Sequence, residues 1–449
     1  DADTQSLRIG VLGAGGRGGE AYGGWFVRHP QRAHVAAVAD PRTARRDALG
    51  EQAGVPASAR FDDWRELLAA SSALELDAVV VALPDHQHVE PTVAAAELGL
   101  AVLLEKPIAP TEAELERVAA AASRTGASIG VAHVLRSTPF WSAVHQLLSM
   151  PVMGRMLTIR HEENIGFWHF AHSYVRGNWK NAAESSPMVL AKTCHDLDLI
   201  RWLAGAMPQR LSSVGSLELF RPEHAPAGAP ARCTDGCPVA DSCAFYAPRY
   251  YVEALRNVHG WPVALLSDDT SPEGRMAALR EGPYGECVYR AGNDVVDHQQ
   301  TVMEFPDGLT ATLSTSGLTS ANTRTMQITC AGGELTGRMD TGQISVALFS
   351  PTAELGELPD GVREVSRTTT GPLQHRVIEL QAGAELDRAG DHRAHGGGDD
   401  AYTARFVAAL AAGTLDHDPD LSLETALDSH RMAFAAERSR LSGETVTLE

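Results

Sequence analysis

The sequence predicts an α/β protein in which an N-terminal doubly wound parallel sheet is followed by an α+β domain with a large open, mostly antiparallel sheet. Over the first third of the chain, apolar strands alternate with helical segments and short connections. From residue 294 onward, apolar and polar residues instead alternate with the period of half-buried strands. Because 449 residues exceed what one hydrophobic core usually serves, we expect two domains, 1–133 and 134–449.

The first strand, residues 8–12, runs straight into a glycine-rich turn of the pattern GxGxxG. Such a turn presents backbone N–H groups at the start of a helix, where the helix dipole favours a pyrophosphate. A second strand, residues 34–39, ends in an acid at the position that usually holds the ribose of NAD. The pattern therefore predicts a Rossmann dinucleotide site formed by Gly13, Gly15, Gly16, Arg17, Gly18 and Asp40.

Arginines that follow Asp40 leave NADP as an alternative cofactor. Arg42, Arg45 and Arg46 could bind a 2′-phosphate, but the Asp40 carboxylate would repel it. We therefore expect NAD rather than NADP, with Arg42 as a further cofactor contact.

The alternation continues to residue 132. We expect helices at 61–70, 89–98 and 111–124, and strands at 76–83, 101–104 and 128–132. Ligands of such sheets bind beyond the carboxyl ends of the strands, so the residues that follow each strand should face the cofactor or the substrate. These residues are Leu83, Pro84, His86, His88, Glu105, Lys106 and His133.

Composition excludes several classes of partner. A formal net charge of −19 at pH 7 argues against nucleic acid and against an anionic membrane surface. No apolar run approaches the roughly 20 residues of a membrane span, and no basic segment precedes an apolar one at the N-terminus. We therefore expect a cytoplasmic protein with a small-molecule partner.

An aromatic and polar segment follows the first strand of the second domain. That strand is expected at 156–160, and residues 161–181 are expected to form a loop directed towards the cofactor. Aromatic faces and fixed hydrogen-bond donors suit a sugar ring, although a subunit interface is also enriched in these residues. The candidate substrate contacts are Trp168, His172, Tyr174, Arg176 and Trp179.

An insertion rich in proline and glycine is expected at about 221–286, as a lid or an interaction surface. It contains Cys233, Cys237 and Cys243, which could bind a structural zinc ion with Cys194, Cys287 or a histidine as fourth ligand. Free cysteines and a disulfide are the alternatives. After the insertion we expect antiparallel strands around a Pro-Asp-Gly turn, a linker at 388–400, and helices at 401–412 and 423–441 that pack back on the first domain.

Several of these motifs together resemble the Gfo/Idh/MocA oxidoreductases, a family of NAD(P)-dependent sugar and cyclitol dehydrogenases. The resemblance rests on the glycine turn, on Pro84-Asp85-His86-Gln87-His88, on Glu105-Lys106-Pro107, on His195-Asp196-Leu197-Asp198 and on Gly398-Asp399. It implies that Lys106 hydrogen-bonds the reacting hydroxyl and that His195 is the catalytic histidine and proton acceptor. It also implies a homodimer or homotetramer.

The chain departs from the family pattern four residues before His195, where the family usually carries an aspartate and this chain has Ala191. Lys192 projects about 100° around the helix from Ala191, so it cannot replace that carboxylate, but it could contact substrate. Asp198 lies three residues after His195 and could orient the imidazole instead.

The resemblance implies an NAD-dependent oxidoreductase that transfers a hydride between a ring hydroxyl of a sugar or glycoside and the nicotinamide, with Lys106 and His195 in proton transfer. The change at Ala191 leaves two alternatives. One is an NAD-retaining glycoside hydrolase that works by transient ring oxidation, elimination, water addition and re-reduction; the other is an NAD-binding sensor. Convergence of two of the cations Arg176, Lys180 and Lys192 would indicate an anionic group on the substrate, such as a carboxylate, sulfonate or phosphate. For the hydrolase alternative, the resemblance implies that the substrate could be an anionic sugar such as a sulfoquinovoside.

Overall fold

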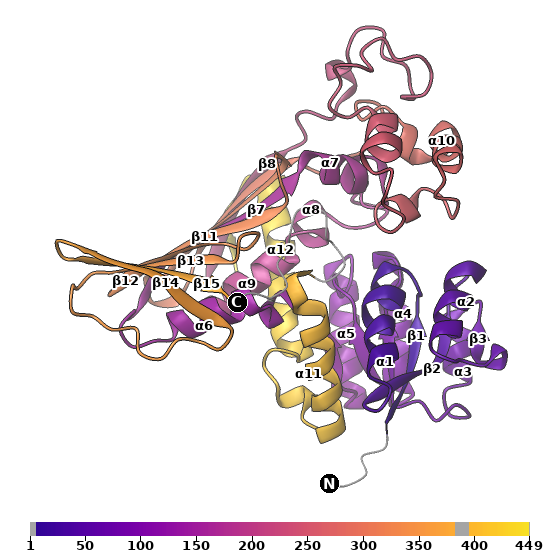
Figure 1. Ribbon diagram of the computed structural model, residues 1–449. Coiled ribbons are helices and arrows are strands. Elements are labelled where there is room, and N and C mark those ends of the chain that lie inside the picture. The colour runs from indigo at the N-terminus through magenta and orange to yellow at the C-terminus, as the bar shows by residue number, and fades with distance from the viewer. Residues whose placement is uncertain (1–5, 382–394, 449) are drawn as a thin grey trace.

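The computed structural model describes residues 6–381 and 395–448 and contains two β-sheets (Figure 1). One is a six-stranded parallel sheet in the order β3-β2-β1-β4-β5-β6, and the other is a ten-stranded, mostly antiparallel sheet. The predicted fold class is confirmed.

The N-terminal sheet is buried on both faces, as expected for a parallel sheet covered by helices. Its strands are β1 (Leu7–Leu12), β2 (Ala33–Ala39), β3 (Arg60–Phe61), β4 (Ala78–Val81), β5 (Ala101–Leu104) and β6 (Ile129–Val131). Its helices are η1 (Gly16–Gly23), α1 (Gly24–Arg28), α2 (Thr43–Gln52), η2 (Ala57–Ala59), α3 (Trp64–Ala69), η3 (Asp85–Gln87), α4 (Val89–Glu97) and α5 (Glu112–Thr125).

The helix expected at 61–70 begins three residues late. Phe61 pairs with Ala39 of β2, and helix α3 starts at Trp64, after Asp63 caps it by accepting a hydrogen bond from the backbone N–H of Arg65. The first residue that was predicted to be helical therefore pairs with the sheet instead.

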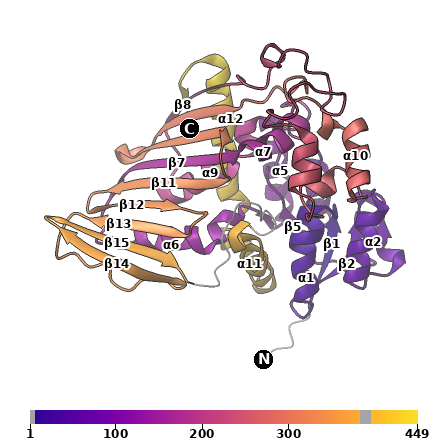
Figure 2. The ribbon, with the colours of Figure 1, turned by 45° about the horizontal axis from the view of Figure 1, so that its top comes forward.

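The C-terminal sheet has the order β14-β15-β13-β12-β11-β7-β10-β9-β8-β16, and Figure 2 shows its strands side by side. Helices α9 and α12 pack against one face, and polar residues alternate onto the other. The strands are β7 (Met156–Gly166), β8 (Arg210–Ser216), β9 (His298–Glu304), β10 (Thr310–Thr319), β11 (Thr323–Cys330), β12 (Gly333–Arg338), β13 (Gln343–Leu348), β14 (Val362–Thr370), β15 (Leu373–Leu380) and β16 (Val446–Thr447).

Strand β7 is longer than predicted, because residues 161–166 continue it instead of starting a loop. This stretch pairs with β10 on one side and β11 on the other. Alternate side chains from Ile159 to Ile165 point inwards and are buried. Polar residues occupy some of the inward-facing positions of this stretch, so its sequence lacks the alternation of apolar and polar residues that predicts a strand.

Helices at the domain junction bring the C-terminal end of the chain back to the first domain. Helix α12 contacts α5 of the first domain and β8 of the second. Residues 388–394 of the predicted linker lie outside the described residues, and His395 already belongs to a helical turn. The remaining helices are η4 (Val134–Ser137), α6 (Pro139–Leu148), α7 (Phe167–Phe170), η5 (Ala171–Arg176), α8 (Met188–Ala191), α9 (Cys194–Ala204), η10 (Pro306–Gly308), η11 (His395–Gly397), α11 (Gly398–Ala412), η12 (Leu415–His417) and α12 (Leu423–Ser442).

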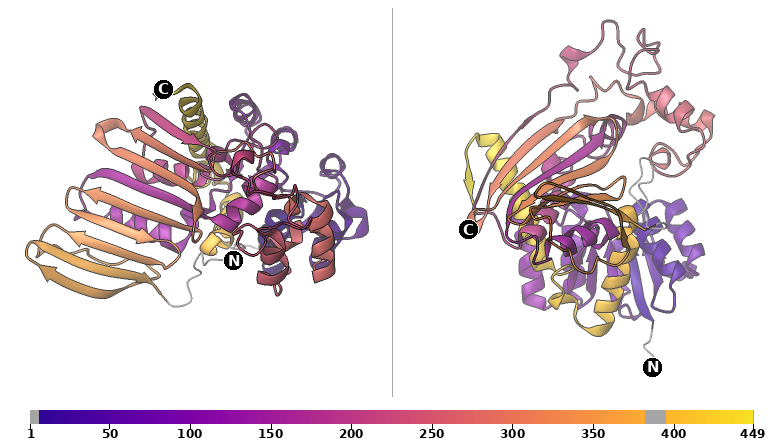
Figure 3. Two further views of the ribbon diagram at one scale, coloured as in Figure 1. Left: turned by 90° about the horizontal axis from the view of Figure 1, so that it is seen from above. Right: turned by 60° about the vertical axis from the view of Figure 1, so that its left-hand side comes forward.

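The insertion between β8 and β9 stands above helix α2 of the first domain, as the views in Figures 1 and 3 agree. It has a small core of its own around Tyr251, Leu279 and Tyr284. Its helices are η6 (Pro222–His224), η7 (Arg249–Ala254), η8 (Val263–Leu265), α10 (Pro272–Glu281) and η9 (Pro283–Gly285). Among the described residues, none of the helices has the length and apolar character needed to cross a membrane.

Candidate active site

A cleft of about 770 Å³ opens between the first domain, the segment that follows β7, and the insertion. This volume is typical of small-molecule sites. Eight of the residues predicted from sequence to be functional line it: Gly15, Gly16, Arg17, Lys106, Tyr174, Trp179, Lys192 and His195.

The glycine turn forms a cradle of the shape that a pyrophosphate needs. Gly13 has φ +91°, and a Cβ there would lie 2.4 Å from the carbonyl oxygen of Ala82. A Cβ at Gly18 would lie 1.8 Å from the carbonyl oxygen of Gly13, whereas the space beside Gly16 is open. The turn is therefore tightly packed behind and open towards the cleft, which fits the close approach of a dinucleotide phosphate.

Asp40 holds the shape of this turn. Its carboxylate accepts hydrogen bonds from the backbone N–H groups of Ala14 and Arg42, each at 2.8 Å. Although both Asp40 and Arg42 were predicted as cofactor contacts, the described lining of the cleft includes neither side chain.

Arg17 connects the glycine turn to two other parts of the chain. Its guanidinium donates to Glu105 at 2.5 Å and makes two hydrogen bonds of 2.8 Å to Asp399 on α11. Burial alone would raise the pKa of Asp399, but the charges of Arg17 and His395 outweigh it and lower that pKa. Glu105 also accepts a hydrogen bond from Tyr22 at 2.5 Å, and its pKa is likewise lowered.

The loop after β4 is held in place next to the cleft by hydrogen bonds of His88 and Asp85. His88 is buried, with Nδ1 2.6 Å from the carbonyl oxygen of Pro107 and Nε2 2.8 Å from that of Leu83. Asp85 accepts a hydrogen bond from Nε1 of Trp179 at 3.0 Å. The described cleft lining does not include several of the residues predicted as cofactor contacts, namely Gly13, Gly18, Leu83, Pro84, His86, His88 and Glu105.

His195 lies in the first turn of α9 and is buried at the cleft wall. Its ring lies edge-on to that of His133, 5.7 Å away, and is tilted by 55° to that of His395, 5.9 Å away, where both distances join ring centroids. Burial, and then the charge of Lys106, lower the pKa of His195 well below its ordinary value. His195 is therefore neutral near pH 7 and has a lone pair available to accept a proton.

Lys106 follows β5 in a cis peptide bond to Pro107. Its Nζ donates to the backbone carbonyl of Ala191 at 3.0 Å. The position where a carboxylate was expected thus contributes a backbone carbonyl that fixes the lysine of the cleft.

Asp198 does not replace the missing carboxylate, contrary to the alternative drawn from the sequence. Its two oxygens accept hydrogen bonds from Arg136, one of them at 2.7 Å from Nε. Asp196 is similarly held by His161 at 2.6 Å and by Arg324 at 2.8 Å. Both carboxylates near His195 on α9 are therefore already paired.

Glu163 is a cleft residue that the sequence analysis missed. It is buried on β7, lies 3.1 Å from Nζ of Lys192, and forms an ion pair with Arg324 at 2.9 Å. Burial raises its pKa despite these two cations. Glu163 occupies an inward-facing position of the strand, between His161 and Ile165. A carboxylate at such a position is the signal that could have revealed it.

Several predicted substrate contacts lie outside the cleft lining formed by the described residues. His133 is buried behind His195, beside His430. His172 contacts the hydroxyl of Tyr251 at 2.7 Å and stacks on Tyr284, whereas Trp168 packs near Tyr250.

The three cations that would mark an anionic substrate do not converge. Arg176 donates to the backbone carbonyls of Glu286 and Phe245, and Lys180 donates to that of Ala291. Only Lys192 of the three lines the cleft, where Glu163 offsets its charge.

The insertion covers the cleft with residues that the sequence analysis did not single out as contacts. His259 and Trp261 line the cleft opposite Arg45 and Gln52 of α2. A role of the insertion as a lid stays a prediction. An aromatic residue within a proline- and glycine-rich insertion was the available signal for these contacts.

Of the cysteines considered for a zinc site, four line one cavity and Cys194 does not. Cys194 lies in α9, whereas Cys233, Cys237, Cys243 and Cys287 all line a second, small cavity. All six cysteines are free. Within the described ranges, no three metal-ligating side chains already stand together as a coordination site.

Comparisons with known proteins agree with the fold. Relatives include an inositol 2-dehydrogenase of Corynebacterium glutamicum (30% identity, 45% of this chain, 56% of the relative) and a 2,7-anhydro-N-acetylneuraminate hydratase of Mediterraneibacter gnavus (26%, 47% and 53%). The chain thus spans about half the length of these curated relatives. A solved levoglucosan dehydrogenase in complex with NADH and levoglucosan has the same fold, with a TM-score of 0.68, 16% identity and 99% of each chain covered.

Two family models cover nearly the whole chain. The model described as "Oxidoreductase family, NAD-binding Rossmann fold" matches residues 7–133, and "Oxidoreductase family, C-terminal alpha/beta domain" matches residues 146–448. The chain therefore belongs to the Gfo/Idh/MocA oxidoreductase family and begins with an NAD-binding Rossmann domain.

Proposed function

We propose that this protein is an NAD-dependent oxidoreductase that acts on a ring hydroxyl of a sugar or glycoside. The observation that carries the proposal is the meeting, in one cleft, of the glycine cradle, a lysine ammonium and a neutral histidine. Gly15, Gly16 and Arg17 would border the dinucleotide, and NAD, when bound, supplies a hydride acceptor. The family and its sugar-acting relatives support this reading.

Lys106 and His195 divide the proton chemistry in this proposal. Lys106 is held by the Ala191 carbonyl, so its remaining N–H groups can donate to the substrate hydroxyl and stabilise negative charge on that oxygen. His195 is kept neutral by burial and can accept the hydroxyl proton. Trp261 and the rest of the insertion would exclude water from the reacting carbon.

A second candidate is a glycosidase that oxidises the sugar ring transiently and reduces it again. Ala191 in place of the family's acid favours it, because Asp198, the nearest substitute, is paired with Arg136. The relative named as a hydratase also supports chemistry other than net redox for this fold. An NAD-binding sensor without turnover is the third candidate.

One experiment separates the three candidates. The purified protein is incubated with a panel of sugars and chromogenic glycosides, with and without added NAD, while NADH absorbance and aglycone release are both followed. Net NADH formation supports the dehydrogenase. Aglycone release without net NADH replaces it with the glycosidase, and NAD binding with neither signal supports the sensor.

Lys192 is expected to contact a neutral part of the substrate. Replacing it with methionine should raise KM by about tenfold and change kcat less, because one charge-assisted hydrogen bond is worth about 1.5 kcal/mol. Steady-state kinetics check this, with K180M as control because Lys180 lies outside the described cleft lining. An unchanged KM would leave Lys192 only the role of neutralising Glu163.

We also propose that the open face of the C-terminal sheet pairs two copies of the chain. Val214 on β8 and Val302 on β9 are 67% and 54% exposed and are diagonal neighbours on adjacent strands, so two apolar side chains face solvent together. The double variant V214K/V302K should shift the protein to monomers in light scattering. A monomeric parent protein would contradict the proposal.

A further inference from the structure

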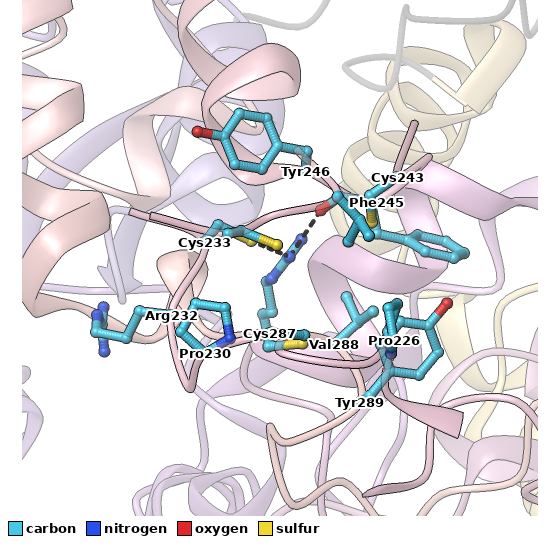
Figure 4. Close-up of a pocket in the computed structure, with 14 residues that line it drawn as sticks. Pro226, Pro230, Arg232, Cys233, Cys243, Phe245, Tyr246, Cys287, Val288 and Tyr289 are labelled. Atoms are coloured by element: carbon cyan, nitrogen blue, oxygen red, sulfur yellow. Dashed lines mark hydrogen bonds between the residues drawn. The ribbon is translucent and has the colours of Figure 1, made fainter. Parts of the chain in front are cut away.

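Four cysteines that are widely separated in the sequence surround one small cavity inside the insertion. Figure 4 shows Cys233, Cys243 and Cys287 around it, and Cys237 also lines it. The cavity measures about 10 Å³, close to the minimum that holds a single atom-sized guest. The thiols that line this small space therefore determine what it can bind.

Backbone pairing places the most distant cysteine beside the first. Arg232 and Glu286 form an antiparallel bridge, flanked by hydrogen bonds of 2.8 Å from Cys233 N–H to the Gly285 carbonyl and from Cys287 N–H to the Ala231 carbonyl. In such a ladder, Cys233 and Cys287 are diagonal neighbours on the same face.

Tight turns bring the other two thiols to the same place. Gly236, with φ +77°, reverses the chain immediately before Cys237. The N–H of Cys243 then donates to the carbonyl of Val239 at 2.9 Å, which closes a further turn. No helix or strand of the described structure lies between Cys233 and Cys243, so this loop has little packing of its own to hold it.

A buried cation with no carboxylate partner stands at this cavity. Arg176 is only 3% exposed; it donates to the carbonyls of Glu286 (2.7 Å) and Phe245 (2.8 Å) and to Sγ of Cys233 (3.5 Å). Over residues 6–381 and 395–448, no ion pair to a carboxylate is found for Arg176. A buried charge of this kind is costly unless an anion offsets it.

We propose that Cys233, Cys237, Cys243 and Cys287 form a metal centre in which four thiolates bind a thiophilic metal, with a single Zn²⁺ as the expected occupant. Each thiol loses one proton as its sulfur binds, so four protons are released and no group is oxidised or reduced. The resulting core carries a net charge of −2, for which Arg176 supplies a counter-charge.

Binding requires the sulfurs to close in on the cavity from their described positions. Zinc–sulfur bonds are about 2.3 Å long, and rotation about χ1 lets each cysteine sulfur move between staggered positions while its backbone stays in place. An iron–sulfur cluster would use the same four thiolates. The small cavity favours the single ion, and the experiment distinguishes the two.

The centre would fix the roof of the active-site cleft. Arg176 belongs to η5, the segment that also contributes Ser173 and Tyr174 to the cleft. The same insertion provides Tyr251, whose hydroxyl contacts His172, and Trp261 in the cleft itself. A metal that fastens Cys233 to Cys287 would therefore hold the insertion onto η5.

Metal content of the full chain tests the proposal. After expression in medium containing both zinc and iron, mass spectrometry of the purified protein should find one zinc per chain, and cobalt substitution should give the visible spectrum of a tetrahedral thiolate site. Iron with acid-labile sulfide would support the thiolate centre and overturn zinc as its occupant. A folded, metal-free protein that takes up neither metal would overturn the centre.

Two further measurements locate the metal. C287A should lose the bound metal, whereas C330A should keep it, because Cys330 lies on β11 and is not part of the described lining of the cavity. Should C287A fail to fold, alkylation of the parent protein with and without a chelator gives the same information. The four cavity thiols should become reactive together on metal removal, and unchanged labelling of them would contradict the proposal.

Discussion

Replacing His195 with asparagine should lower kcat/KM by about 10²- to 10⁴-fold, the usual contribution of a positioned general base. It should also change the pH profile. Because burial and Lys106 lower the pKa of His195, the neutral base persists below pH 6.5, and the acidic limb of kcat/KM in the parent protein should lie below the ordinary pKa of histidine. The variant should lose that limb.

The control for this prediction is H145N. His145 is half-buried, stacks on Trp202 and is not part of the described cleft lining, so its loss tests the general cost of removing an imidazole. H195N should still bind NADH, because the substitution leaves the residues of the glycine cradle unchanged. A variant with full activity and the parent pH profile would exclude His195 as the proton acceptor.

The parts of the site that the sequence predicted are those encoded by local signals. Residues 101–104 form a short apolar run bounded by turn residues, and strand β5 has these bounds, so Lys106 was placed correctly at a strand end. The glycine turn was predictable for the same reason, because it needs residues without a Cβ at fixed offsets.

The parts that the sequence did not reveal depend on pairing between distant segments. Asp198 looked available on its helix, but Arg136, 62 positions earlier, occupies both of its oxygens. Glu163 gained its role only when Lys192 and Arg324 were placed beside it by the fold. Arg176 was predicted to contact substrate, yet the insertion that surrounds it directs it towards Cys233. Such partners are set by tertiary packing, which no local pattern encodes.

Replacing Arg17 with methionine should destabilise the protein by about 3–5 kcal/mol, because it leaves Glu105 and Asp399 as buried carboxylates without their cation. The folded-state pKa values of both carboxyls are lowered. Their ion pairs therefore contribute stability above the unfolded pKa of about 4, and this contribution is lost as pH falls through the lower folded values. Urea unfolding at pH 7 measures the effect.

A neighbouring ion pair supplies the matched control. Arg28 and Asp400 join the same two regions of the chain, but both side chains are about half exposed, so R28M should cost no more than about 1 kcal/mol. Adding D399N to R17M should recover part of the loss, because the unpaired charge is then removed as well. If R17M weakens NADH binding while the free energy of unfolding is unchanged, Arg17 acts on the dinucleotide. If the free energy of unfolding falls and the affinity for NADH falls with it, Arg17 acts by holding α11 against the glycine turn.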